Sequence, residues 1–247
     1  MFPYTFPFIL QDFLDSAGNG NISDVKKHLD DGVHMNSQNE DGGTALMNAS
    51  ANGHEAVCEL LITRGCNVDM QDKDGYTALM IASSNGHEAV CELLITRGCN
   101  VDMQNKDGGT ALMNASANGR EAVCELLITR GCNVDMQNKD GRTALIYASD
   151  NGHRAVCELL ITRGCNVHMQ SKNGWTALIY ACYGGYIPII FSLIAAGCDF
   201  SLRNKAGKSG MDILREKHPS KVDSVRQFQR KVGIDIAGYS VITTRHG

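Results

Sequence analysis

A period of 33 residues dominates this chain. Residues 41 to 71 recur at residues 107 to 137 with one change, His54 to Arg120. A unit of this size is too small to bury its own apolar face, so neighbouring units must stack into a solenoid. Function is therefore expected on a surface rather than in a pocket. Aligned on Asp-Gly-x-Thr-Ala-Leu, the units start at Asp41, Asp74, Asp107, Asp140 and Asn173, with a degenerate unit opening at Ala206.

Composition excludes several classes of protein. The 247 residues carry a formal charge of -4, with a pI near 6.0, so no excess of basic residues favours a nucleic acid partner. The aromatic N-terminus lacks the basic region and cleavage site of a signal peptide. The longest apolar stretch, Tyr186 to Gly197, is shorter than the roughly 18 residues that a membrane span needs, so no membrane insertion is expected.

Nine of the ten cysteines follow the repeat, which explains their number. Their spacing within a unit is not that of a zinc site, so we expect no metal, and no other cofactor is indicated. As small buried apolar residues they predict free thiols in a reducing compartment, the cytoplasm or the nucleus. They recur at two positions of the unit: Cys58, Cys91, Cys124, Cys157, and Cys66, Cys99, Cys132, Cys165, Cys198.

The unit from Asp74 to Lys106 predicts two antiparallel helices and a loop. Thr77 is placed to cap a short helix over residues 78–83, and Asn85-Gly86 ends it. A second helix over residues 88–96 carries a broad apolar stripe and is closed by Gly98. The polar stretch that ends in Asp-Gly has the composition of a tight turn. We therefore expect helices near residues 45–51 and 55–63 that recur with the period.

This unit resembles the ankyrin repeat, whose pattern runs D-x-x-G-x-T-P-L-H-x-A-A-x-x-G-H-x-x-V-V-x-L-L-L-x-x-G-A-x-V. The resemblance covers residues 12 to 217 and implies an all-α solenoid of helix-turn-helix units joined by β-turn loops, in a protein that binds another protein. In the unit that starts at Asp74 the matching residues are Gly75, Thr77, Leu79, Ala82, Gly86, His87, Val90, Leu93, Leu94, Ile95, Gly98 and Val101.

The repeats divide the chain into one elongated domain with degenerate ends. The end units are interpreted as capping repeats, whose outer faces must be polar because nothing stacks on them. The predicted segments are an extension (1–11), an N-terminal cap (12–40), five repeats (41–73, 74–106, 107–139, 140–172, 173–205), a C-terminal cap (206–232) and a tail (233–247).

Two departures from the family pattern concern the loops. Thr-Pro-Leu-His is replaced by Thr-Ala-Leu-Met or Thr-Ala-Leu-Ile, which removes a histidine that ties adjacent loops in the family, so looser loops are expected. The asparagine that is hydroxylated in the family is also replaced, so that modification loses its target at these positions: Asp69, Asp102, Asp135 and His168.

No catalytic arrangement stands outside the repeat. Gly207-Lys208-Ser209 resembles the end of a phosphate-binding loop, but its first glycine is missing and no strand precedes it. The histidines at 54, 87 and 153 recur in phase, and Arg120 replaces one of them without other change. We interpret them as residues that form a hydrogen bond at the turn between helices. We therefore expect that the chain is not an enzyme.

Three columns of the alignment vary strongly between otherwise similar units. In ankyrin repeats these positions line the concave face and make the usual partner contacts, so the resemblance implies a protein-binding site there. Units four and five carry aromatic residues and arginine, the types that dominate interface energies. The alternative is that these aromatics only pack on neighbouring helices or the cap. The candidate protein-binding residues are Tyr76, Ile81, Arg142, Tyr147, Asp150, Trp175, Tyr180 and Tyr183.

The fifth unit places Phe191 where earlier units place a glutamate on the outer face of the second helix. A phenylalanine there needs cover. A cap helix is expected over residues 221–232, and the apolar segment after it, from Ile234 to Ile242, is predicted to cover Phe191; otherwise that face binds a partner.

The sequence thus predicts a monomeric, non-enzymatic scaffold that binds a partner protein through the concave face of the array. Two other functions stay open. The chain could be a targeting or adaptor subunit that brings substrates to a separate enzyme, although no recruitment motif is visible. It could also be a structural spacer, which the near-identical units one and three favour.

Overall fold

The computed structural model describes residues 5–233, and side chains from Phe8 onward. Within that range it contains fourteen α-helices, one short 3₁₀ helix and no strand, only two isolated β-bridges. The chain divides into two compact units, residues 1–133 and 134–247. Both are helical, so the all-α fold class is confirmed.

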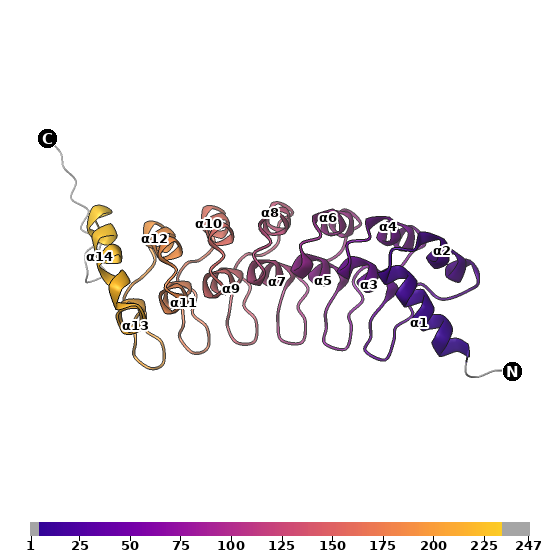
Figure 1. The fold of residues 1–247 in the computed structure, drawn as a ribbon, viewed down its shortest axis with the longest axis horizontal. Helices are drawn as coiled ribbons and strands as arrows, with labels where there is room; N and C mark the ends of the chain where they lie inside the picture. The colour runs from indigo at the N-terminus through magenta and orange to yellow at the C-terminus, as the bar shows by residue number, and fades with distance from the viewer. Residues whose placement is uncertain (1–4, 234–247) are drawn as a thin grey trace. The chain divides into compact units, whose positions relative to one another are not determined.

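In the first unit each repeat contributes two helices, and like helices stack on like (Figure 1). The first helices are α1 (Thr5–Gly18), α3 (Ala45–Ala51), α5 (Ala78–Asn85) and α7 (Ala111–Ala117). The second helices are α2 (Ile22–Asp30), α4 (Glu55–Thr63), α6 (Glu88–Thr96) and α8 (Glu121–Thr129). The bounds of α3 and α4 agree with those predicted from capping and periodicity. The helix α1 begins before residue 12, where the sequence placed the start of the cap.

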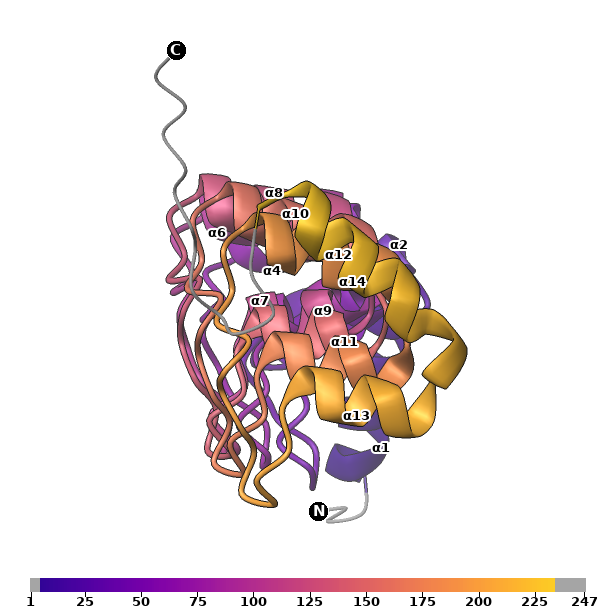
Figure 2. The same cartoon turned by 90° about the vertical axis from the view of Figure 1, so that its left-hand side faces the viewer.

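The second unit repeats this arrangement (Figures 1 and 2). Its first helices are α9 (Ala144–Asp150), α11 (Ala177–Gly184) and α13 (Gly210–Lys217). Its second helices are α10 (Arg154–Thr162), α12 (Ile187–Ala195) and α14 (Val222–Lys231), and the 3₁₀ helix η1 (Pro219–Lys221) leads into α14. The helices α13 and α14, which form the C-terminal cap, pack on α11 and α12 respectively.

Local capping decides where the first helices begin. In each full repeat a buried threonine precedes the helix, and its hydroxyl accepts a hydrogen bond from the third helical N–H, as Thr77 does from Met80 at 3.3 Å. The loss of such a cap costs about 1 kcal/mol. The first helix of the C-terminal cap begins with a capping box, in which the side chains of Ser209 and Asp212 each accept a hydrogen bond from the other residue's backbone N–H. These hydrogen bonds lower the pKa of Asp212 to about 2.

The core of each repeat lies between its two helices and against the next repeat. In the second repeat Leu79 on α5 faces Val90 and Leu94 on α6, and all three are at most 2% exposed. One polar residue is buried there as well: the hydroxyl of Ser83 lies 3.6 Å from the sulfur of Cys91. The fifth repeat replaces this serine–cysteine pair with Cys182 and Ile190, and both are fully buried.

A repeating glutamine ties neighbouring loops together. The side-chain amide of Gln71 donates to Gly75 O at 2.7 Å within its own loop and to Gln104 O at 3.1 Å in the next loop. Gln38, Gln137 and Gln170 make the same pair of hydrogen bonds. The expectation of looser loops, drawn from the missing family histidine, stays a prediction, although this glutamine joins adjacent loops without that histidine.

The aspartates that stand where the family has asparagine also join repeats. The carboxylate of Asp69 accepts the backbone N–H of Asn100 at 3.0 Å, and that of Asp135 accepts the N–H of Asn166 at 2.8 Å. At the corresponding position His168 accepts the N–H of Asp199 through Nδ1 at 3.2 Å. Each of these loops thus receives a side-chain acceptor, and three residue types supply it, since Asn36 accepts the N–H of Asn67 in the same way.

Phe191 packs against the cap helix α14. Its ring stacks on that of Phe228 in α14, with centroids 4.2 Å apart and planes inclined by 14°. The predicted cover from residues 234–242 lies outside the described part of the chain. The expectation that this phenylalanine needs cover agrees with its contact with Phe228, which the sequence analysis did not include, and the part of the tail stays a prediction.

Candidate functional site

In the fourth repeat Arg142 and Asp150 form a partly buried ion pair across the first helix. Arg142 directly precedes Thr143, which caps α9, and Asp150 is the last residue of that helix. A guanidinium nitrogen of Arg142 donates to a carboxylate oxygen of Asp150 at 2.6 Å. The side chains are 21% and 32% exposed, so solvent screens the pair only in part. The arginine is therefore held against the helix surface.

Two tyrosines hold the guanidinium of Arg142. Its central carbon lies 4.2 Å from the ring centroid of Tyr147 and 4.9 Å from that of Tyr180 in the next repeat. The hydroxyl of Tyr147 in turn accepts a hydrogen bond from the amide of Asn138 at 2.9 Å. Such cation–π contacts are worth about 0.5–2 kcal/mol each and leave the arginine few alternative rotamers.

Trp175 in the fifth repeat occupies the alignment position of Arg142 in the fourth repeat. Its ring centroid lies 4.8 Å from that of Tyr180 and 5.6 Å from that of Tyr183, the latter with an edge-on inclination of 70°. Tyr180 and Tyr183 are three residues apart on α11 and so share one face of that helix. Tyr183 is 49% exposed, the most exposed large side chain of this group. Six of the eight residues predicted for the site are thus brought together in repeats four and five.

The same three columns continue into the C-terminal cap, which the sequence analysis missed. One period after Trp175, Tyr180 and Tyr183 come Lys208, Ile213 and Glu216. Lys208 pairs with Glu216, as Arg142 pairs with Asp150, and the hydrogen bond from this lysine lowers the pKa of the Glu216 carboxyl. Counting one further period would have found these residues. We call the residues at these columns in repeats four and five and in the cap the variable face.

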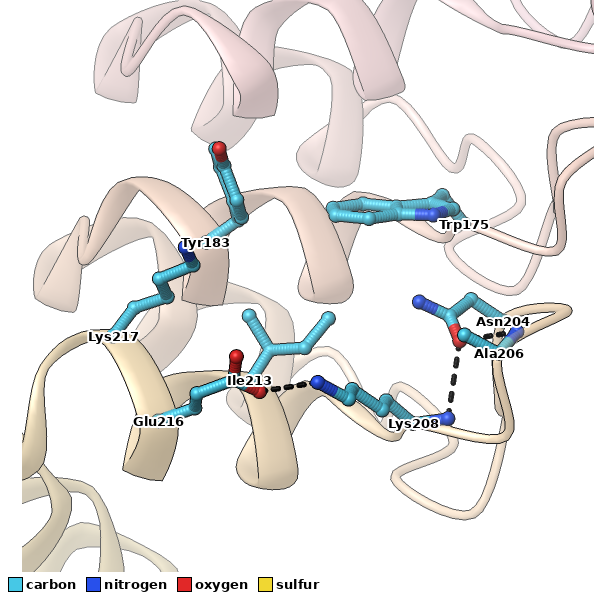
Figure 3. Close-up of a pocket in the computed structure, with 8 residues that line it drawn as sticks. All are labelled: Trp175, Tyr183, Asn204, Ala206, Lys208, Ile213, Glu216 and Lys217. Carbon is cyan, nitrogen blue, oxygen red and sulfur yellow. Dashed lines mark hydrogen bonds and ion pairs between the residues drawn. The ribbon is translucent and has the colours of Figure 1, made fainter.

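Between the fifth repeat and the cap the variable face is hollowed by a cavity of about 190 Å³. Figure 3 shows the rings of Trp175 and Tyr183 on one side of it and Ile213 on the other. The remaining lining residues are Asn204, Ala206, Lys208, Glu216 and Lys217. The amine of Lys217 lies 5.4 Å from the ring centroid of Tyr183. The cavity therefore has apolar walls and a charged rim.

Comparison with known proteins decides the family. The family model for ankyrin repeats (three copies) matches residues 13–105, 85–171 and 112–204. The chain belongs to the ankyrin repeat family. A crystal structure of the human ASB11 ankyrin repeat domain is similar, with a TM-score of 0.79 and 22% identity, and the match covers 87% of this chain and 96% of that one. At this identity the likeness shows the fold alone. No curated protein matches the chain.

Ankyrin repeats generally mediate protein–protein interaction, and their fold is typically a non-enzymatic interaction module. No helix in residues 5–233 is long and apolar enough to cross a membrane. Over the same described residues, no group of three or more His, Cys, Asp or Glu side chains is placed to hold a metal ion.

The other two residues predicted for the site lie in the second ankyrin repeat, in the first compact unit. Tyr76 and Ile81 are both half-buried, and the backbone N–H of Tyr76 donates to Asp72 at 2.8 Å. Their part in binding stays a prediction.

The histidines of the ankyrin repeats are structural. Nε2 of His87 lies 3.0 Å from Ala51 O, at the end of the first helix of the preceding repeat, and Nε of Arg120 donates to Ser84 O at 3.1 Å in the same way. The predicted hydrogen bond is present, and it joins two repeats. The resemblance to a phosphate-binding loop is also explained, because Ser209 caps α13 and Lys208 pairs with Glu216.

The cysteines of the ankyrin repeats are free, and all except the half-buried Cys66 are buried. Burial raises the pKa of Cys58, Cys91 and Cys124 to about 11, so little reactive thiolate forms near neutral pH. We expect an alkylating reagent at about pH 8 to modify the native chain slowly, with Cys66 first, and to modify all ten thiols after unfolding. Intact mass over time measures this. Rapid modification of several cysteines in the folded chain would contradict it.

Proposed function

We propose that this chain is a non-enzymatic interaction module that binds a partner protein through its variable face. The observation that carries the proposal is the aromatic and arginine group around Tyr183. Tryptophan, tyrosine and arginine are the residues most enriched among those that dominate interface energies. Here they occur in adjacent repeats, beside a cavity, and one of the rings is half exposed.

The group is also held in place before any partner arrives. Arg142 is fixed by Asp150 and by two rings, and Trp175 is fixed by two tyrosines. Ordering a long side chain on binding costs about 0.5–1.5 kcal/mol. A surface whose side chains are already ordered avoids much of that cost, which favours a binding role for the group over simple packing on neighbours.

The test is affinity capture from cell extract with the full chain and with a double variant, Trp175→Ala with Tyr183→Ala. Hot-spot residues contribute about 2 kcal/mol or more each, so the variant is expected to lose at least roughly thirtyfold in affinity for partners of this face. Tyr147 is left unchanged, because its removal would release Arg142 and Asn138. Quantitative mass spectrometry of the captured proteins gives the result.

Phe8→Ala serves as the control, because Phe8 is 78% exposed and lies outside the variable columns. Circular dichroism of all variants should show nearly equal helicity. If the double variant melts far below the parent, the rings are packing residues. If it captures the same proteins as the parent, the face does not bind them and a spacer role gains support.

A further inference from the structure

The cavity between the fifth repeat and the cap has the size of one side chain. At about 190 Å³ it is smaller than the roughly 300–1,000 Å³ of sites for small molecules and cofactors. It is several times larger than the share of about 30 Å³ that one water occupies in the liquid. Its walls of Trp175, Tyr183 and Ile213 favour an apolar occupant (Figure 3).

Asn204 presents an unused hydrogen-bond donor to this cavity. The residue is only 7% exposed, and its carbonyl oxygen accepts the N–H groups of Ala206 and Lys208, both at 3.0 Å. Its amide nitrogen donates to no residue in the described part of the chain, and Figure 3 shows that nitrogen directed toward Trp175. Two periods earlier, the equivalent Asn138 donates to the hydroxyl of Tyr147, but the cap has Ile213 at the place of that tyrosine.

The amide nitrogen of Asn204 faces the cavity, so a bound segment that supplies an acceptor would complete its hydrogen bonding. A peptide carbonyl is the acceptor that any protein segment carries.

The rim adds a charge preference. Lys208 is engaged by Glu216, whereas Lys217 forms no ion pair within residues 5–233 and lies against the face of Tyr183. Two lysines and one glutamate line the cavity, so the rim has an excess of positive charge. An acidic side chain that reached Lys217 would complete the pairing on this rim.

We propose that this cavity binds a short segment of the partner protein through three contacts. One apolar side chain, of the size of leucine or phenylalanine, enters between Trp175, Tyr183 and Ile213. A main-chain carbonyl of the segment accepts the hydrogen bond from Asn204, and a nearby aspartate or glutamate pairs with Lys217. The proposal rests on the proposed function and narrows it to an acidic segment with an apolar anchor.

The experiment selects a display library of random short peptides against the full chain and measures the enriched peptides by fluorescence polarisation. Enriched sequences should share one apolar residue with an acidic residue close by. Ala206→Phe, at an exposed loop position, fills the cavity and should weaken the binding of these peptides by about tenfold or more. Asn204→Asp replaces the free donor with an acceptor and should weaken peptide binding to a similar degree.

The Asn204→Asp variant should fold normally, since Asp72 has the same loop position at the end of the first repeat and accepts the same kind of backbone hydrogen bonds. Asn105→Asp, in the equivalent loop at the end of the second repeat, is the matched control and should leave the affinity unchanged. Lys217→Glu should weaken the binding of the acidic peptides severalfold. Lys205→Glu makes the same charge change outside the cavity lining and should leave their binding unchanged.

Three results would overturn the proposal: no enriched peptide, peptides without the shared pattern, or peptides that bind the Ala206→Phe and Asn204→Asp variants as well as they bind the parent chain. Tighter peptide binding after deletion of residues 234–247 would assign the cavity to the chain's own tail instead. The proposed function fails separately, when no captured protein depends on Trp175 and Tyr183. If such proteins are found but still bind Ala206→Phe, the face binds protein and only the cavity assignment is wrong.

Discussion

Replacing Phe13 with alanine is expected to lower the free energy of unfolding of the N-terminal repeats by about 3–5 kcal/mol. Phe13 is the largest fully buried side chain of α1, with no exposed surface, and its ring edge contacts His28 with centroids 6.0 Å apart. Its removal leaves a cavity that the surrounding helices can fill only in part. Since α1 packs directly on α3, the loss falls on the junction between the cap and the first full repeat.

Urea unfolding followed by circular dichroism measures the effect, and native-state hydrogen exchange locates it. The matched control is Phe8→Ala on the same helix. Phe8 is 78% exposed, so that variant should stay within roughly 0.5 kcal/mol of the parent. Equal effects at the two positions would contradict the packing of α1 described above.

The second large effect is expected at a loop glycine. Gly75 has a φ of +83°, and a Cβ added there would lie 2.8 Å from Lys106 N and 3.0 Å from Asn105 Cα, in the next loop. A left-handed conformation costs an L-residue about 1–2 kcal/mol, and overlap with backbone atoms adds roughly 1–3 kcal/mol. Gly75→Ala should therefore cost about 2–5 kcal/mol and loosen the hydrogen bond between Lys106 N and Asp74 O, now 2.9 Å.

Gly98→Ala separates the conformational cost from the cost of overlap, because Gly98 has a φ of +84° and no atom lies within 4 Å of an added Cβ. That variant should lose only the conformational part, about 1–2 kcal/mol. Both changes are measured by urea unfolding of the full chain. A similar loss in the two variants would show that the loops can separate freely, against the close loop contacts described here.

Much of the candidate site could be predicted from variation between copies. Because the scaffold is nearly identical from unit to unit, residues that change at fixed columns stand out, and six of them meet in repeats four and five. The cap is a degenerate repeat, so its residues at these columns, Lys208 and Ile213, were not predicted. Asn204 was hidden for another reason: polar residues recur at its place in other loops, and only the cavity beside it distinguishes it.

Contacts between neighbouring repeats were harder to predict. The glutamine at Gln71 recurs with the period, and an unvarying residue in a repeat looks like part of the scaffold whatever it does. Its pair of hydrogen bonds depends on the distance between loops, which follows from how the helices stack. The cover of Phe191 by Phe228 likewise depends on where α14 crosses α12.

The sequence by itself determined the period, the family, the all-helical fold and the starts of the repeated helices, whereas α5 runs to Asn85, beyond the predicted 78–83. These features depend on interactions within a few residues: a threonine cap, an apolar stripe and a closing glycine. Only the tertiary structure decided which side chains of different repeats meet, as at the cavity between Trp175 and Ile213, and which donor is left unpaired there, as at Asn204. Such pairs are 30 or more residues apart in the chain, and their geometry arises from helix packing rather than from local chemistry.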